Sequence, residues 1–148
     1  MSLFNPSRDE VRQFFFSTWA KFKREEILSE LEKIALGVMH MHPEYQAILE
    51  APVQFLQQEY FPEFGETNPF LHMSLHVSLR EQIAINQPLG IAALYAKLQV
   101  KYQDEHVAQH AILDCLAETV WQAQRNNSAL DSNNYVQLIR KKLNNTTQ

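Results

Sequence analysis

Apolar residues recur every three or four positions along most of this chain, which is the period of an amphipathic helix. Ser7 is followed three residues later by Glu10, the capping-box spacing that starts a helix, so we expect a helix over residues 7–25. Its apolar stripe consists of Val11, Phe14, Phe15, Thr18, Trp19 and Phe22. Ser29 and Glu32 repeat the spacing and predict a second helix. That helix should end near His42, because a residue before proline disfavours the helical region.

The middle of the chain is less regular. We expect two short helices, over residues 44–50 and 52–60, and then a loop over residues 61–67. Asn68-Pro69 predicts a new helix, since asparagine caps well and proline suits the first helical position. Residues 71–80 also alternate strictly between apolar and polar, which is typical of a strand. The cap and the lack of partner strands elsewhere favour the helix.

Three further helices are expected in the second half. Gln87-Pro88-Leu89-Gly90 interrupts the chain, and an amphipathic helix follows over residues 91–102. Asp104 caps a longer helix that ends near residue 126, and a last helix begins at Asp131. Residues 144–148 form a polar tail that is expected to fray. The pattern predicts an all-α fold, a compact, four-helix-bundle-like antiparallel arrangement in a single domain over residues 1–148.

Composition excludes several classes of function. The chain has only 3 glycines, which argues against all-β and dinucleotide-binding folds, and it carries no phosphate-binding glycine motif, so no nucleotide cofactor is expected. A net charge of −4 gives no pull toward nucleic acid or an anionic membrane. No stretch approaches the roughly 20 apolar residues of a membrane span. A single cysteine, Cys115, and no secretory signal pattern predict a cytoplasmic protein.

The distinctive chemical feature is a set of six histidines in close pairs. They are His40, His42, His72, His76, His106 and His110. His72 with His76, and His106 with His110, are four residues apart, which places each pair on one helix face with Cβ atoms about 5–6 Å apart. Two imidazoles at that spacing can reach one metal ion. Because facing helices in a bundle commonly share a site, the two pairs predict one metal centre.

Other residues extend this predicted centre. Asp114 continues the row of His106 and His110 and would bind the metal or orient a histidine, while His42 would approach from a third direction. His40 is interpreted as structural. A nitrogen-rich set suits Zn²⁺, Ni²⁺ or Fe²⁺ better than Mg²⁺ or Ca²⁺. Four histidines would fill a tetrahedral zinc site, whereas three would leave a position for a catalytic water. Whether the protein is an enzyme stays open.

A second interpretation is a non-enzymatic interaction domain, with the histidines as hydrogen-bonded core groups. It rests on the first helix, whose aromatic residues cover more than one face. They are Phe14, Phe15, Phe16, Trp19 and Phe22. Aromatic rings beyond one face must be buried somewhere, either in the protein's own core or in a homodimer through this helix. Both alternatives remain open at this point.

Motifs spread over nearly the whole chain resemble one family. They are Phe4-Asn5-Pro6-Ser7-Arg8, His42-Pro43-Glu44-Tyr45, Asn68-Pro69-Phe70-Leu71-His72, Gln87-Pro88, Cys115-Leu116-Ala117-Glu118 and Trp121-Gln122-Ala123-Gln124-Arg125. The chain resembles the bacterial family called domain of unknown function 1841 (DUF1841), which implies a small cytoplasmic protein without an assigned activity. The family pattern has histidine at each of the five candidate positions, and often glutamate where Asp114 stands. The histidine layout is also loosely similar to metal-binding four-helix bundles of the hemerythrin-like and DinB-like types.

Overall fold

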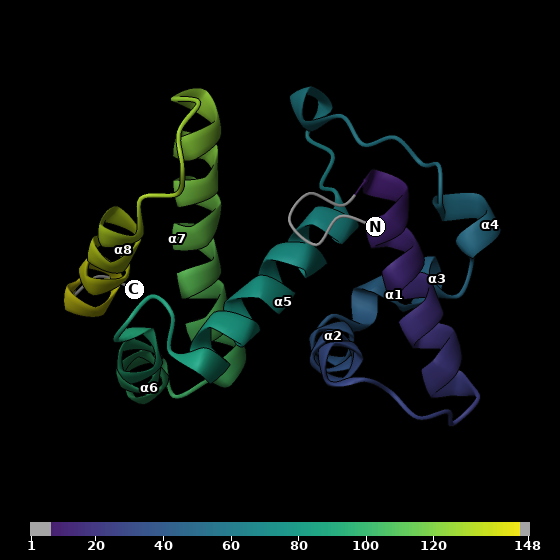
Figure 1. The fold of residues 1–148 in the computed structure, drawn as a ribbon, viewed down its shortest axis with the longest axis horizontal. Helices are drawn as coiled ribbons and strands as arrows, with labels where there is room; N and C mark the ends of the chain where they lie inside the picture. Colours follow the sequence, from purple (N-terminus) through teal and green to yellow (C-terminus); the bar gives the residue numbers. More distant parts are fainter. Residues whose placement is uncertain (1–6, 146–148) are drawn as a thin grey trace. The chain divides into compact units, whose positions relative to one another are not determined.

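The computed structural model describes residues 7–145, and the regular elements in this range are all helical (Figure 1). They are α1 (Arg8–Lys23), α2 (Glu30–Met41), η1 (Pro43–Tyr45), α3 (Gln46–Leu49), α4 (Pro52–Phe55), η2 (Pro62–Phe64), α5 (Pro69–Ile85), α6 (Ile91–Tyr102), α7 (Glu105–Arg125) and α8 (Ser132–Asn144), where η marks a 3₁₀ helix. The predicted all-α class is therefore confirmed, and residues 71–80 are helical. The antiparallel four-helix-bundle arrangement stays a prediction. None of the described helices has the length and apolar character needed to cross a membrane.

Two sequence predictions fall partly outside the described residues. The first motif of the family resemblance includes residues 4–6, and the polar tail includes residues 146–148. Of the predicted tail, Asn144 ends α8 and residue 145 follows it outside any helix.

Side-chain caps start several helices where the sequence predicts them. Ser7 and Ser29 each form a complete capping box, in which the carboxylate of the glutamate three residues later accepts from the serine N–H. Asp104 accepts from the Val107 N–H at 2.9 Å, and Asp131 accepts from the Asn134 N–H at 3.0 Å. Each cap satisfies an N–H group that has no partner within the helix.

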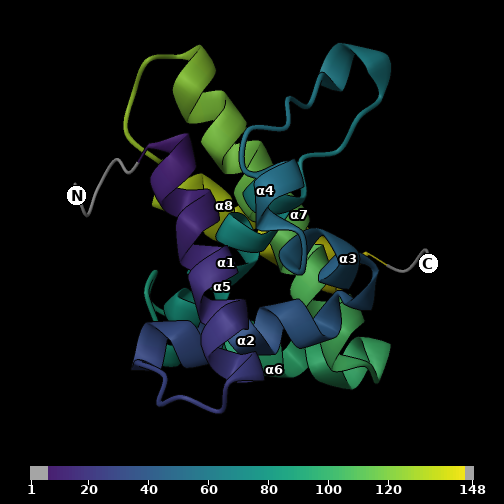
Figure 2. The same ribbon diagram turned by 90° about the vertical axis from the view of Figure 1, so that its right-hand side faces the viewer.

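The chain groups into two compact units, residues 1–77 and 78–148, and the boundary between them falls within α5. In the first unit α1 packs against α2 and α3 (Figure 2). In the second unit α6, α7 and α8 pack against one another. A single domain over residues 1–148 stays a prediction.

Aromatic residues of α1 contribute to the core of the first unit. Phe15, Phe16 and Trp19 are buried, and Phe16 meets Phe70 of α5 edge to face at a centroid distance of 5.5 Å. Phe22, near the end of the helix, is exposed. This burial supports the core-packing interpretation of the aromatic helix. A homodimer through α1 stays a prediction.

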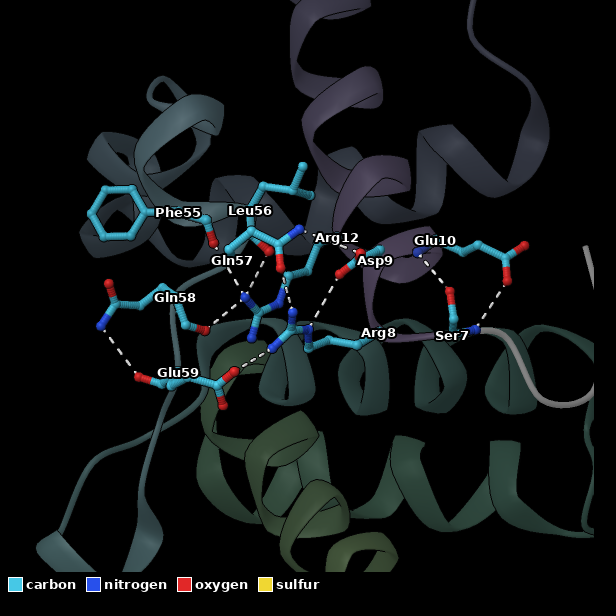
Figure 3. A network of polar contacts seen from close by, with 10 residues as sticks. All are labelled: Ser7, Arg8, Asp9, Glu10, Arg12, Phe55, Leu56, Gln57, Gln58 and Glu59. Carbon is cyan, nitrogen blue, oxygen red and sulfur yellow. Dashed lines mark hydrogen bonds and ion pairs between the residues drawn. The ribbon is translucent and has the colours of Figure 1, made fainter.

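One predicted helix is too long. The sequence predicts a helix over residues 52–60, but α4 ends at Phe55. The physical reason is Arg12, whose Nη1 donates to the main-chain carbonyls of Phe55 (3.2 Å), Leu56 (2.9 Å) and Gln58 (2.7 Å) (Figure 3). These carbonyls would otherwise need N–H donors from the next turn, and Pro62 has no N–H to offer the carbonyl of Gln58.

Candidate metal centre

His42 lies directly after the last residue of α2. The helix stops at Met41 because Pro43 disfavours the helical region for the residue before it, and His42 takes φ −126° and ψ 66°. The His42 N–H still donates to the carbonyl of Met39 at 3.0 Å. The His42 carbonyl then accepts from the Tyr45 N–H at 2.9 Å, which closes the η1 turn. The chain is therefore hydrogen-bonded on both sides of His42.

His72 and His76 lie in the first half of α5. The Asn68 side chain accepts from the N–H groups of Phe70 (3.0 Å) and Leu71 (3.2 Å), as expected of an N-cap. The predicted Asn68-Pro69 helix start is thus confirmed. One helical turn separates His72 from His76. Because Phe70 and Met73 are buried in the core of the first unit, the rotation of this part of α5 is fixed, and so is the direction of the histidines.

These three histidines converge within the first unit. Their ligating nitrogens lie within 4.8 Å of one another. His42 Nε2 is 3.2 Å from His76 Nδ1, and the His42 ring meets the His72 ring edge to face with centroids 4.6 Å apart. His42 and His76 are buried, whereas His72 is half-buried. The site is therefore largely shielded from water, and the half-buried His72 ring is the one of the three that reaches solvent.

Two residues of η1 hold His42 from outside the cluster. The Glu44 carboxylate lies 3.1 Å from His42 Nδ1. The Tyr45 ring stacks on the His42 ring, with centroids 5.2 Å apart and an interplanar angle of 19°. Burial, with the neighbouring Glu44 charge, raises the pKa of Tyr45, so its phenol is neutral at pH 7. Neither residue was assigned a role from the sequence. The signal available was the proline between His42 and Glu44, which forces a turn at that point.

The other predicted ligands lie on α7 in the second unit. The rings of His106 and His110 meet edge to face with centroids 4.2 Å apart, so they do share a helix face. The Asp114 carboxylate is mostly exposed and lies 3.7 Å from Lys142 Nζ. These three residues stay predicted ligands. His40, interpreted as structural, is exposed on α2 and meets Phe22 edge to face at 5.1 Å.

Cys115 contributes no nucleophile. Burial raises the pKa of its thiol to about 11, and Sγ donates to the Ala111 carbonyl at 3.4 Å. Since the thiolate is the reactive form, the thiol is inert at neutral pH. Cys115 is a small buried residue of α7.

The chemistry available to the cluster follows from its donor atoms. Neutral imidazole nitrogens bind borderline transition-metal ions, and three of them meet here without a carboxylate among them. Histidines close together can therefore hold a metal ion in this protein. Without an ion, the same nitrogens can also bond to each other, since 3.2 Å is an N–H···N hydrogen-bond distance.

Comparison with known proteins identifies the family. The family model described as Domain of unknown function (DUF1841) matches residues 7–141. Searches of curated proteins and of solved structures find no significant match. The matched segment includes all the histidines, the whole of α5 and most of α8. The chain therefore belongs to the family described as Domain of unknown function (DUF1841).

Proposed function

We propose that this protein binds a divalent transition-metal ion through His42, His72 and His76. The observation that carries the proposal is the convergence of three imidazole nitrogens to within 4.8 Å of one another. A purely nitrogen donor set favours Zn²⁺, Ni²⁺ or Fe²⁺ over Mg²⁺ and Ca²⁺, which prefer oxygen. Zinc is the natural probe, because it has no geometric preference from its d electrons.

The spacing of the nitrogens supports this assignment. Two nitrogens bound to one tetrahedral zinc ion at about 2.0 Å lie roughly 3.3 Å from each other. His42 Nε2 and His76 Nδ1 are 3.2 Å apart. The separation of these two nitrogens therefore already matches that of two ligands on one zinc ion. The half-buried His72 ring can adjust by rotating about its side-chain torsions at little cost.

Three protein ligands leave at least one position on the ion. That position is available to water, which is the arrangement of catalytic zinc sites, or to a further histidine, which is the arrangement of structural ones. His110 is our proposed further ligand, since it belongs to the second pair with helical i, i+4 spacing. His106 and Asp114 are the alternatives on the same helix.

A second candidate function rests on the same contact. If His76 donates its Nδ1–H to His42 Nε2, the histidines are core hydrogen-bonding groups. The protein would then be a non-enzymatic interaction domain. This alternative makes the opposite prediction about metal, because a hydrogen-bonded pair does not require an ion.

Competition titration of untagged protein with zinc and a chromophoric chelator separates the two candidates. We expect one zinc ion per chain, and a loss of affinity of more than about a hundredfold in His76→Ala. Such a loss exceeds the usual effect of removing a residue that contacts a ligand but not the metal itself. His40→Ala is the matched control, an exposed histidine on α2 outside the cluster, and should bind like the wild type. Absence of zinc binding, or equal binding by both variants, would favour the hydrogen-bonded core.

A second variant assigns the further ligand. His110→Ala should weaken zinc binding as His76→Ala does if His110 is a ligand. Unchanged affinity in His110→Ala, beside a loss in His76→Ala, would exclude His110 and leave His106, Asp114 or water as the remaining ligand. His106→Ala is the matched comparison, since it removes the other member of the same pair.

A further inference from the structure

We infer that Glu44 is a positioning residue that tunes the metal affinity of this site by fixing the protonation pattern of His42. This inference rests on the proposed metal binding and adds a residue outside the ligand set. The Glu44 carboxylate lies 3.1 Å from His42 Nδ1, on the side of the ring opposite the nitrogen that faces His76. A histidine ligand that donates its other N–H to a carboxylate is a recurring arrangement in metal sites.

The chemistry of the contact fixes which nitrogen carries the proton. An ionised carboxylate can only accept a hydrogen bond, so His42 Nδ1 must be the donor. The neutral His42 ring then carries its lone pair on Nε2, the atom 3.2 Å from His76 Nδ1. That is the form a metal ion requires. Glu44 thus holds His42 in the tautomer that is ready to bind.

A negative charge on the far side of the ring also strengthens the ligand. It stabilises the positive charge that the imidazole gains when it donates its lone pair. The Glu44 side chain is 59% exposed, so water screens part of this effect. We therefore expect a change near the lower end of the usual range for such contacts, about tenfold in affinity.

The position of the His42 ring is also restrained by Tyr45, so the electronic effect of Glu44 can be distinguished from a steric effect. Its ring stacks on His42 at 5.2 Å and 19°, and it lies edge to face with His72 at 6.1 Å. The Tyr45 stack therefore restrains the plane of the His42 ring without help from Glu44. Removal of the Glu44 carboxylate should leave the ring in place and change mainly its tautomer and basicity.

Zinc competition titration of the whole chain tests the inference with two variants. Glu44→Gln keeps an oxygen acceptor for His42 Nδ1–H but removes the charge, and Glu44→Ala removes both. We expect zinc affinity to fall about tenfold in Glu44→Ala and by less in Glu44→Gln. Glu50→Ala is the matched control, because Glu50 is an exposed carboxylate that pairs with Lys23 at 3.5 Å. It should bind zinc like the wild type.

Three outcomes would overturn the inference, and they are distinguishable. Unchanged zinc affinity in both Glu44 variants, beside a loss in His76→Ala, would remove Glu44 from the site and leave the metal proposal standing. A Glu44→Ala effect that persists at full size in a His42→Ala background would show that it does not act through His42. No zinc binding by the wild type would overturn both proposals. Thermal unfolding of the metal-free variants separates a general loss of stability from a loss of affinity.

Discussion

Arg8 and Arg12 occupy successive turns of α1, yet their environments differ (Figure 3). Arg8 is exposed and pairs with Glu59 at 2.7 Å. Arg12 is buried, and its guanidinium lies over the ring of Phe70 at 4.8 Å while Nη1 donates to three carbonyls. Exposed ion pairs contribute little to stability, whereas a buried carbonyl without a donor is costly. We therefore expect Arg12 to stabilise the contact between α1 and the segment after α4 more than Arg8 does.

This difference predicts unequal effects of the same substitution. Arg12→Met keeps apolar contact with Phe70 but leaves the three carbonyls without this donor, so the free energy of unfolding should fall by about 2–4 kcal/mol. Arg8→Met is the matched control and should cost much less. Urea unfolding of both variants measures the difference. Equal destabilisation by the two variants would contradict the assigned role of Arg12.

The reactivity of Cys115 gives a second prediction at the residue scale. Its pKa of about 11 means that only about one thiol in a thousand is ionised at pH 8. Iodoacetamide should therefore modify the native protein far more slowly than the protein unfolded in urea, as followed by mass spectrometry. Comparable rates in the two states would show that the thiol is accessible and ionised, contrary to its burial.

The residue scale also shows what the sequence could predict of the site. The i, i+4 spacing identifies His72 and His76, because helix geometry alone puts them on one face. His42 was predicted as a third ligand from its place at the end of α2. Glu44 was missed, since its contact with His42 depends on the turn that follows Pro43 and has no helical periodicity.

Among the elements, α2 begins at a capping box and ends next to the candidate metal centre. Its first turn contains Glu32, whose carboxylate accepts from the Ser29 N–H at 2.8 Å and from Lys21 Nζ at 2.9 Å. Both hydrogen bonds lower the pKa of Glu32, and the bond from the Ser29 N–H has the larger effect. At the other end of α2, His42 directly follows the last helical residue, Met41. The capping box therefore helps to hold the helix that His42, a proposed ligand, directly follows.

The lowered pKa of Glu32 predicts a pH-dependent contribution to stability. A carboxyl whose pKa is lower in the folded state stabilises the fold above its unfolded-state pKa and loses that contribution as the pH falls through its folded-state pKa. The difference in unfolding free energy between the wild type and Glu32→Gln should thus be positive at pH 7 and shrink toward zero below about pH 4. Urea unfolding across this range measures it.

Glu30→Gln is the control for this pH dependence. Glu30 lies in the same turn, is largely exposed, and pairs only with Lys33 at 3.2 Å in the contacts described for this turn. Its substitution should change the stability little at any pH. A Glu32→Gln difference that does not vary with pH would mean that the carboxyl keeps its ordinary pKa.

Helix starts were more predictable than helix ends. Ser7, Ser29, Asn68, Asp104 and Asp131 all cap helices as expected, because a cap is a local interaction within three residues. The end of α4 was predicted wrongly, since it depends on Arg12, more than forty residues away in the chain. Local patterns cannot report such a long-range donor.

At the scale of the whole molecule, the chain is an all-helical member of its family with two compact units. The three histidines that converge come from two segments of the first unit that are thirty residues apart, His42 after α2 and His72 with His76 on α5. A metal ion bound by these histidines would join the two ends of the segment between His42 and His72. This segment contains the short helices η1, α3, α4 and η2 and the first residues of α5. Metal binding and the stability of the first unit should therefore be linked.

X-ray absorption spectroscopy at the zinc edge of the zinc-loaded, untagged protein tests the central claim most directly. We predict a shell of nitrogen donors at about 2.0 Å with the outer scattering of at least three imidazole rings, reduced by one ring in His76→Ala and unchanged in His40→Ala. A shell of oxygen donors alone, or a spectrum that His76→Ala leaves unchanged, would contradict the proposal that His42, His72 and His76 bind a metal ion.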